Sequence, residues 1–291
     1  MTTASPAPAR RHIDHAIELY DLTYRPLSLL YGFDNRIGCL GLRSNVLWIL
    51  GYPEAALAGA NQGLNEARAL DHAGNMFQAL HNAIITHFLC RNYATLEALA
   101  NELFALAEEQ KSAAQWQPVG LIYRGWAFAG TDRASEAVQL IASGLATYRL
   151  TGATFLTSTI LSSLAKTQAD LGQFDDVWRF ISEAKEVIER TGERWLEVYV
   201  HCVAGEIALK SPQPDLAKAE AHFERALAVA RGQQAKSWEL RAAMSMARLW
   251  RDQGKPQQAR ELLAPIYSWF TEGFDTPDLK EAKALLGEMA S

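Results

Sequence analysis

Few residues in this 291-residue sequence stand at spacings that could carry out chemistry. His12 and His15 are three residues apart, as ligands on one helix face would be, but zinc sites use three or four ligands and no third lies nearby in the sequence. Asp175 and Asp176 are adjacent carboxylates, and at the start of a helix such carboxylates interact with the helix dipole. We therefore predict that the chain is not an enzyme and uses no metal or cofactor.

The segment 232–237, Gly-Gln-Gln-Ala-Lys-Ser, has a faint similarity to a phosphate-binding loop. A P-loop requires Gly-x-x-x-x-Gly-Lys-Ser/Thr after a strand, whereas Ala235 precedes the lysine here and helical patterns lie on both sides. Ser143 stands in Ala-Ser-Gly and lacks the Gly-x-Ser-x-Gly elbow of a serine hydrolase. The sequence therefore predicts a helix–helix turn at 232–237 and no nucleophile at Ser143.

Apolar and small residues recur with a nearly constant period, which is typical of a helical repeat protein. Six turn signals are each followed by such residues at i, i+4 and i+7, the spacing of one helix face. The first residues of these sets are Ala56, Leu96, Ala137, Val177, Ala219 and Ala259. Their separations are 40, 41, 40, 42 and 40 residues, and no sustained alternation predicts a strand. The predicted fold is all-α: a right-handed superhelical solenoid of TPR-like helical hairpins, with six repeats and a C-terminal capping helix.

The two ends of the sequence carry separate predictions. Thr276 and Pro277 suit the first positions of a helix, so we expect the capping helix over residues 276–291. Ala16 lies one period before the first repeat, which predicts a second helix whose partner helix is missing, an open end that could support oligomers. We expect a disordered tail over 1–11 and the repeat domain over 12–275. Glycines are expected to close the second helices at Gly152, Gly192, Gly232 and Gly273.

Segments 47–57, 241–254 and 259–282 carry a further signal, and the run Phe-Thr-Glu-Gly-Phe-Asp-Thr-Pro-Asp-Leu at 270–279 is its most specific part. They resemble the C-terminal tetratricopeptide-type region of large bacterial signalling ATPases, many of which carry an adenylate or guanylate cyclase domain. The cyclase and ATPase domains themselves are missing from this sequence. The resemblance implies a non-catalytic interaction or regulatory module whose partner is a protein or peptide, with cyclase and ATPase domains among the candidates.

In standard tetratricopeptide arrays the first helix of each hairpin lines the concave face. The equivalent positions and their neighbours are Asn45, His81, Ile85, Arg124, Ser162, Lys166, Glu206, Arg241, Arg248 and Arg251. Because Arg124, Lys166 and Arg248 are basic in an acidic chain, a concave groove is predicted to hold an acidic peptide, a carboxylate terminus or an anion. The alternative is an ordinary solvated charged face.

Net charge and cysteine content argue against several further classes of function. With 28 Lys and Arg against 33 Asp and Glu, the net charge is −5, which argues against a general nucleic-acid-binding protein. Cys39, Cys90 and Cys202 are far apart in apolar surroundings, as expected of reduced thiols in a cytoplasmic protein, and no apolar run predicts a membrane span. Two functions stay open: a protein-interaction module, or the small-molecule-sensing repeat domain of a transcriptional regulator or cyclase. An enclosed pocket with convergent polar groups would favour the second.

Overall fold

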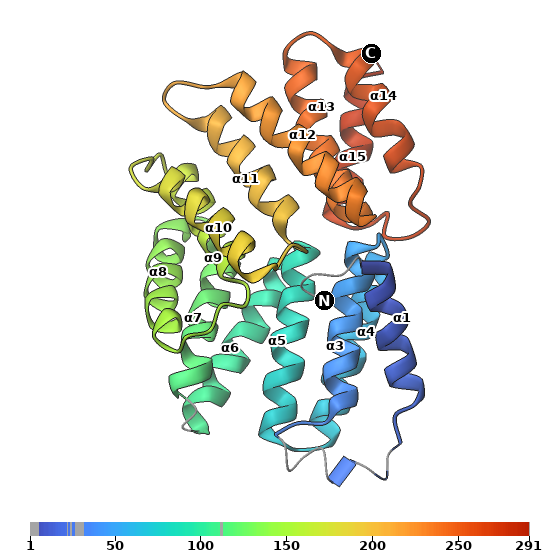
Figure 1. Ribbon diagram of the computed structural model, residues 1–291, viewed down its shortest axis with the longest axis vertical. Coiled ribbons are helices and arrows are strands. Elements are labelled where there is room, and N and C mark those ends of the chain that lie inside the picture. Colours follow the sequence, from blue (N-terminus) through green and yellow to red (C-terminus); the bar gives the residue numbers. More distant parts are fainter. Residues whose placement is uncertain (1–5, 22, 24, 27–31, 111–112, 291) are drawn as a thin grey trace. The chain divides into compact units, whose positions relative to one another are not determined.

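The computed structural model describes residues 6–21, 23, 25, 26, 32–110 and 113–290, and its elements over these residues are α-helices without a strand (Figure 1). The chain divides into two compact units. One consists of Ala7–Trp48 and Tyr52–Ala153, and the other consists of Ile49–Gly51 together with the chain from Thr154 onward. No helix among the described residues is long and apolar enough to cross a membrane.

The first unit contains three helical hairpins preceded by a separate helix. Each hairpin packs against the next, and the first helices of the second and third hairpins also touch one another. Two hydrogen bonds from Arg36 to Glu66 link the helices of the first hairpin. The helices are α1 (Pro6–Glu18), α3 (Asn35–Ile49), α4 (Pro53–Ala69), α5 (Ala73–Leu89), α6 (Tyr93–Glu109), α7 (Ala113–Phe128) and α8 (Ala134–Leu150).

The second unit repeats the same arrangement. Three hairpins follow one another, and a final helix packs on both helices of the last hairpin. First helices of successive hairpins are in direct contact. Each of these hairpins therefore buries its apolar side against the hairpins next to it in the sequence, as in other helical repeats. The helices are α9 (Thr157–Asp170), α10 (Val177–Thr191), α11 (Glu197–Lys210), α12 (Leu216–Gln233), α13 (Lys236–Asp252), α14 (Pro256–Tyr267) and α15 (Pro277–Glu288).

The repeat phase read from the sequence is confirmed by burial. The residues that open the six apolar sets are all fully buried, and each lies in the first turns of a second helix. Four of the six are alanines, whose small side chains let two helix axes approach closely. Trp126, Trp195 and Trp238 are also buried, so these indoles pack between helices. The all-α hairpin fold is therefore confirmed, and its right-handed superhelical sense stays a prediction.

The N-terminal expectations need correction. Helix α1 begins at Pro6, so residues 6–11, expected in a disordered tail, are helical, while residues 1–5 lie outside the described residues. Ala16 is exposed and Ala9 is buried, so the phase that made Ala16 a helix-crossing residue is wrong. Asp14 of this helix forms an ion pair with Arg43 on α3.

Two of the four closing glycines behave as expected. Gly152 and Gly192 follow α8 and α10 with φ of 74° and 69°, the left-handed region that glycine tolerates. Gly232 lies inside α12, because the Gln234 amide reaches back to carbonyls of the last turn and Gln234 itself takes the left-handed conformation. Gly273 belongs to the connection between α14 and α15, so its predicted role in closing a helix is wrong.

Candidate binding face of the first helices

The predicted face on α9 and α11 is a set of paired charges. Lys166 donates a hydrogen bond of 2.6 Å to Glu206 and lies 3.6 Å from Asp170. Lys210 on α11 is in turn ion-paired with Asp170 on α9. Two of the predicted binding residues, Lys166 and Glu206, are thus partners of each other. Their charges cross-link adjacent first helices, which is a structural role.

The arginines of α13 are paired in the same way with α15. Arg241 donates to one carboxylate oxygen of the helix at 2.9 and 2.8 Å, and Arg248 lies 3.0 Å from a second carboxylate. Arg251 is ion-paired with a third and also with Asp252 on its own helix. The three carboxylates of α15, in the same order, belong to Asp278, Glu281 and Glu288. Carboxylates of α15 therefore neutralise the predicted basic groove along α13.

Asn45 and Ser162 are buried, so the prediction that they face a groove is wrong. Asn45 on α3 donates to Asn82 at 3.2 Å and accepts from the Thr86 hydroxyl at 2.8 Å, and both partners lie on α5. The Ser162 hydroxyl donates to the carbonyl of Ser158, one turn earlier in α9. These side chains satisfy buried polar groups, which would otherwise destabilise the packed helices.

His81 on α5 joins a group of aromatic side chains. Its Nδ1 lies 2.8 Å from the Tyr123 hydroxyl on α7, and its ring meets the edge of Trp116 at a centroid distance of 5.8 Å. The Trp116 indole is stacked on Phe77 at 4.9 Å. Burial lowers the pKa of His81 to about 4 and raises the pKa of Tyr123. At neutral pH His81 is therefore an uncharged member of an aromatic cluster between α5 and α7.

Arg124 on α7 keeps an unsatisfied donor. Its guanidinium carbon lies 5.4 Å from the centroid of the Phe104 ring on α6, a cation–π contact. The buried Nε atom has no hydrogen-bond acceptor, and no carboxylate of the described residues forms an ion pair with this side chain. A buried guanidinium donor without an acceptor is costly, and a carboxylate is the group that satisfies it most strongly. Among the basic candidates, Arg124 is thus the one without a carboxylate partner in the described part of the chain.

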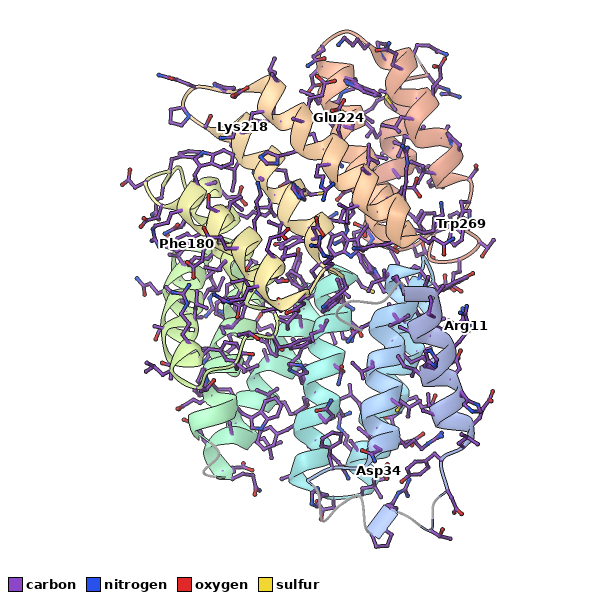
Figure 2. The ribbon with its side chains drawn as sticks, viewed as in Figure 1. Arg11, Asp34, Phe180, Lys218, Glu224 and Trp269 are labelled. Atoms are coloured by element: carbon purple, nitrogen blue, oxygen red, sulfur yellow. The ribbon has the colours of Figure 1, made fainter. Side chains whose placement is uncertain are left out.

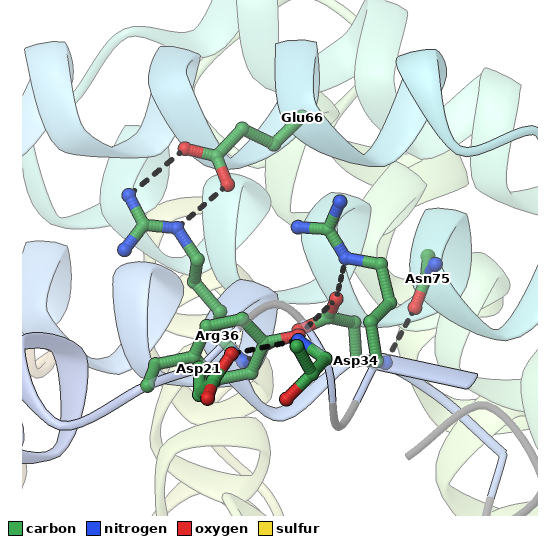
Figure 3. Close-up of polar contacts among 8 residues, drawn as sticks. Asp21, Asp34, Arg36, Glu66 and Asn75 are labelled. Atoms are coloured by element: carbon green, nitrogen blue, oxygen red, sulfur yellow. Dashed lines mark hydrogen bonds and ion pairs between the residues drawn. The ribbon is translucent and has the colours of Figure 1, made fainter. Parts of the chain in front are cut away.

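A polar cluster lies at the start of α3 (Figure 3). The spacing of its residues is not typical of a ligand site, so the cluster was not predicted from the sequence. The buried Asp34 carboxylate accepts from the Tyr20 hydroxyl at 2.7 Å and from Arg25 at 2.6 Å. The Asp34 amide donates to the Asn75 side chain at 2.7 Å. The only sequence signal was an aspartate directly before a predicted helix, a common capping residue. These contacts fasten the chain before α3 to the start of α5.

A surface hollow of about 480 Å³ lies beside this cluster. Its walls are Tyr20, Arg25, Arg36, Glu66, Ala69 and Leu70. The two arginines already bind carboxylates, Arg25 to Asp34 and Arg36 to Glu66. The hollow therefore offers a small molecule few unpaired polar groups.

The described residues contain no group of three or more His, Cys, Asp or Glu side chains that could hold a metal ion. Cys90 and Cys202 are buried, Cys39 is half-buried, and all three are free thiols. Burial raises the pKa of the Cys39 and Cys202 thiols, which makes them poor nucleophiles. The segment 232–237 contains the turn between α12 and α13, which consists of Gln234 and Ala235, and its other residues belong to the two helices.

Comparisons with known proteins identify the fold. No family model matches the sequence, and no curated protein matches it. Among solved structures the chain is similar to RapI in "Crystal Structure of the Apo Form of RapI", a TPR-like helical repeat protein. The TM-score is 0.58 and the sequence identity is 10%, with 97% of this chain and 91% of that chain covered. The likeness extends over almost all of both chains and supports a TPR-like repeat fold.

Proposed function

We propose that the chain is a non-catalytic interaction module that binds an acidic protein segment on the first helices α5 and α7. Helical repeats present successive first helices as one continuous surface, and such surfaces commonly bind extended or helical segments of other proteins. The fold likeness to RapI over 97% of the chain supports this general role.

The observation that carries the proposal is the unsatisfied Arg124. Lys166 and Arg248, the other basic positions of the predicted groove, already have carboxylate partners on neighbouring helices. The Arg124 Nε atom is buried without an acceptor. The Arg124 side chain as a whole is half-buried, so a partner's carboxylate supplies the missing acceptor once the side chain turns outward, and the guanidinium can hold that carboxylate in a two-pronged geometry.

The half-buried rings of α5 and α7 suggest the rest of the bound segment. His81 and Trp116 meet edge to face and are only half-buried, and His81 is neutral. Aromatic rings bury large apolar areas, so they favour apolar side chains on the partner. The preferred ligand is therefore a segment in which Asp, Glu or a terminal carboxylate stands beside apolar residues.

The signatures at 47–57, 241–254 and 259–282 suggest the context. Because they resemble repeat regions of bacterial signalling ATPases and cyclases, we include domains of those proteins among the partners to be tested. The alternative function is small-molecule sensing, and the 480 Å³ hollow beside Asp34 favours it by volume, since ligand pockets commonly have this size. The pairing of Arg25 and Arg36 with carboxylates weighs against it.

A peptide selection tests the proposed function. Random twelve-residue peptides displayed on phage are selected on the full chain, and the recovered peptides are tested on Arg124→Gln. We expect Asp and Glu to be enriched beside apolar residues, with binding lost in the variant. Arg68→Gln is the matched control, because Arg68 lies on α4 and pairs with Glu102. Peptides without acidic enrichment, or an empty selection, would contradict the proposal.

A further inference from the structure

A second group of basic side chains lies between α10, α11 and α12, in the unit from Thr154 onward. His201 on α11 and His222 on α12 face each other, with their Nδ1 atoms 3.4 Å apart. Trp178 on α10 stacks on the His222 ring at a centroid distance of 6.2 Å. The Lys218 ammonium, near the start of α12 (Figure 2), lies 3.3 Å from the centroid of the Trp178 ring. Three helices thus bring two imidazoles and a lysine to one indole.

Lys185 on α10 adds another positive charge to this group. It lies close enough to lower the pKa of both His201 and His222 electrostatically. Burial, and then the charge of Lys218, lower the pKa of Lys185 itself. Lys185 makes no ion pair within the described part of the chain, unlike Lys166 on α9. Positive charges that lie near one another repel, and an anion between them offsets this repulsion.

The charged side chains that act on the two histidines are positive. Arg225 on α12 also lowers the pKa of His201, although it is ion-paired with Glu197 on α11. Glu197 is shared with Arg194, so its charge is already matched twice. No carboxylate contributes to the pKa of either imidazole. The charged groups that act on the two imidazoles are therefore positive, and of the side chains gathered here Lys185, His201 and His222 are half-buried and Lys218 is exposed.

We propose that Lys185, His201, Lys218 and His222 bind a phosphate group between α10, α11 and α12. A phosphate dianion accepts several hydrogen bonds, so it can accept from two ammonium groups and both imidazoles at once. A protonated imidazole donates from both ring nitrogens, so protonation breaks the Nδ1–Nδ1 hydrogen bond and the rings can turn their N–H groups toward the anion. The Trp178 ring gives an apolar wall to whatever the phosphate is attached to. This site is separate from the proposed peptide face, because it uses none of its residues.

The histidine pair could also suggest a metal site. Two imidazoles are fewer ligands than a structural metal normally uses, and the described residues supply no third. The neighbouring lysines would also repel a divalent cation. These two facts favour the anion.

Nuclear magnetic resonance of the histidine rings tests the site on the full chain. Inorganic phosphate is titrated at pH 7 and constant ionic strength, with sodium chloride as the reference salt. We expect the His201 and His222 signals to shift in a saturable manner and to move toward the protonated form. In Lys185→Met, phosphate should bind at least about ten-fold more weakly, since a charge-assisted hydrogen bond is lost.

Lys283→Met is the matched control, because Lys283 is exposed on α15 and distant in sequence from the site. It should leave phosphate affinity within about two-fold of the parent chain, as expected for an exposed charge. Shifts that sodium chloride reproduces, equal affinities in the two variants, or a response to Zn²⁺ but not to phosphate would each overturn the proposal. Adenosine monophosphate distinguishes the source of the anion. Tighter binding than inorganic phosphate indicates a nucleotide whose base stacks on Trp178, and equal binding indicates that free phosphate is enough.

Discussion

Arg241 on α13 donates both Nε and Nη2 to one carboxylate oxygen of Asp278 on α15, at 2.9 and 2.8 Å. Only 15% and 10% of the two side chains is exposed. Asp278 stands in the first turn of α15, where its carboxylate also interacts favourably with the helix dipole. This pair anchors the start of the last helix to the preceding first helix.

Arg241→Met should loosen α15 selectively. The substitution leaves the buried Asp278 carboxylate without its arginine partner, which costs about 2 kcal/mol. Hydrogen exchange of the α15 amides is the direct measurement, since local opening of this helix should become more frequent. Arg248→Met is the matched control: its partner Glu281 is 38% exposed, so the loss should stay below about 1 kcal/mol. Equal protection of α15 in the two variants would show that burial of the Arg241 pair does not matter.

Gly205→Ala should destabilise the contact between α11 and α12. A Cβ atom at this position would lie 2.3 Å from the Phe223 ring, so the helices must separate, at a cost of about 1–3 kcal/mol. Gly232→Ala on α12 is the matched control, because nothing lies within 4 Å of its new Cβ atom. It should stabilise the helix by about 0.5–1 kcal/mol. Urea unfolding of both variants gives the comparison, and a stabilised Gly205→Ala would disprove the close approach.

The stability of the first unit should fall as the pH drops from neutral. In the folded chain burial lowers the pKa of His81 to about 4, whereas the unfolded imidazole titrates near its ordinary value of 6.5. Between these values the unfolded state binds one proton more, so stability is complete above pH 6.5 and falls toward pH 4. The slope is at most about 1.4 kcal/mol per pH unit. Below pH 4 both states are protonated and His81 contributes no further loss.

His81→Gln isolates this contribution, because the amide retains an acceptor for the Tyr123 hydroxyl but cannot titrate. Urea unfolding between pH 7 and pH 4 should give a flatter dependence in the variant. Measurements at pH 8, where the imidazole is neutral in both states, supply the cost of the substitution itself. Parallel curves for the two chains would mean that folding leaves the pKa of His81 unchanged.

Lys185→Met should raise the pKa of both histidines between α11 and α12. Burial, followed by the charge of Lys185, lowers the pKa of His222 to about 4 and that of His201 to about 3. Removing the lysine charge leaves the burial in place, so both values rise without reaching 6.5. Titration of the histidine C–H signals in phosphate-free buffer measures the effect. Unchanged pKa values would place Lys185 away from the two rings.

The fold was predictable because helix crossings constrain side-chain size. Ala137, Ala219 and Ala259 stand where two helices touch, and the same requirement recurs in each hairpin, so it leaves a period in the sequence. The end of a helix is less constrained. The helix α12 continues past Gly232 since a few hydrogen bonds at Gln234 decide where it closes.

The partners of the basic residues were harder to predict. Asp278, Glu281 and Glu288 on α15 are separated by three and seven residues, whereas their partners Arg241, Arg248 and Arg251 on α13 are separated by seven and three. The spacings therefore do not match pair by pair, and they could not have predicted these ion pairs. His201 and His222 lie on different helices, so nothing in their spacing indicates that their rings meet.

A double-mutant cycle measures whether Arg124 holds a carboxylate of a bound segment. A selected peptide and its analogue with each Glu or Asp changed to the amide are titrated against the parent chain and Arg124→Gln. We expect amidation to weaken binding to the parent chain at least about ten-fold and to have little effect on the variant, a coupling of about 1.4 kcal/mol or more. Equal losses in both chains would contradict it, because the carboxylate would then bind elsewhere.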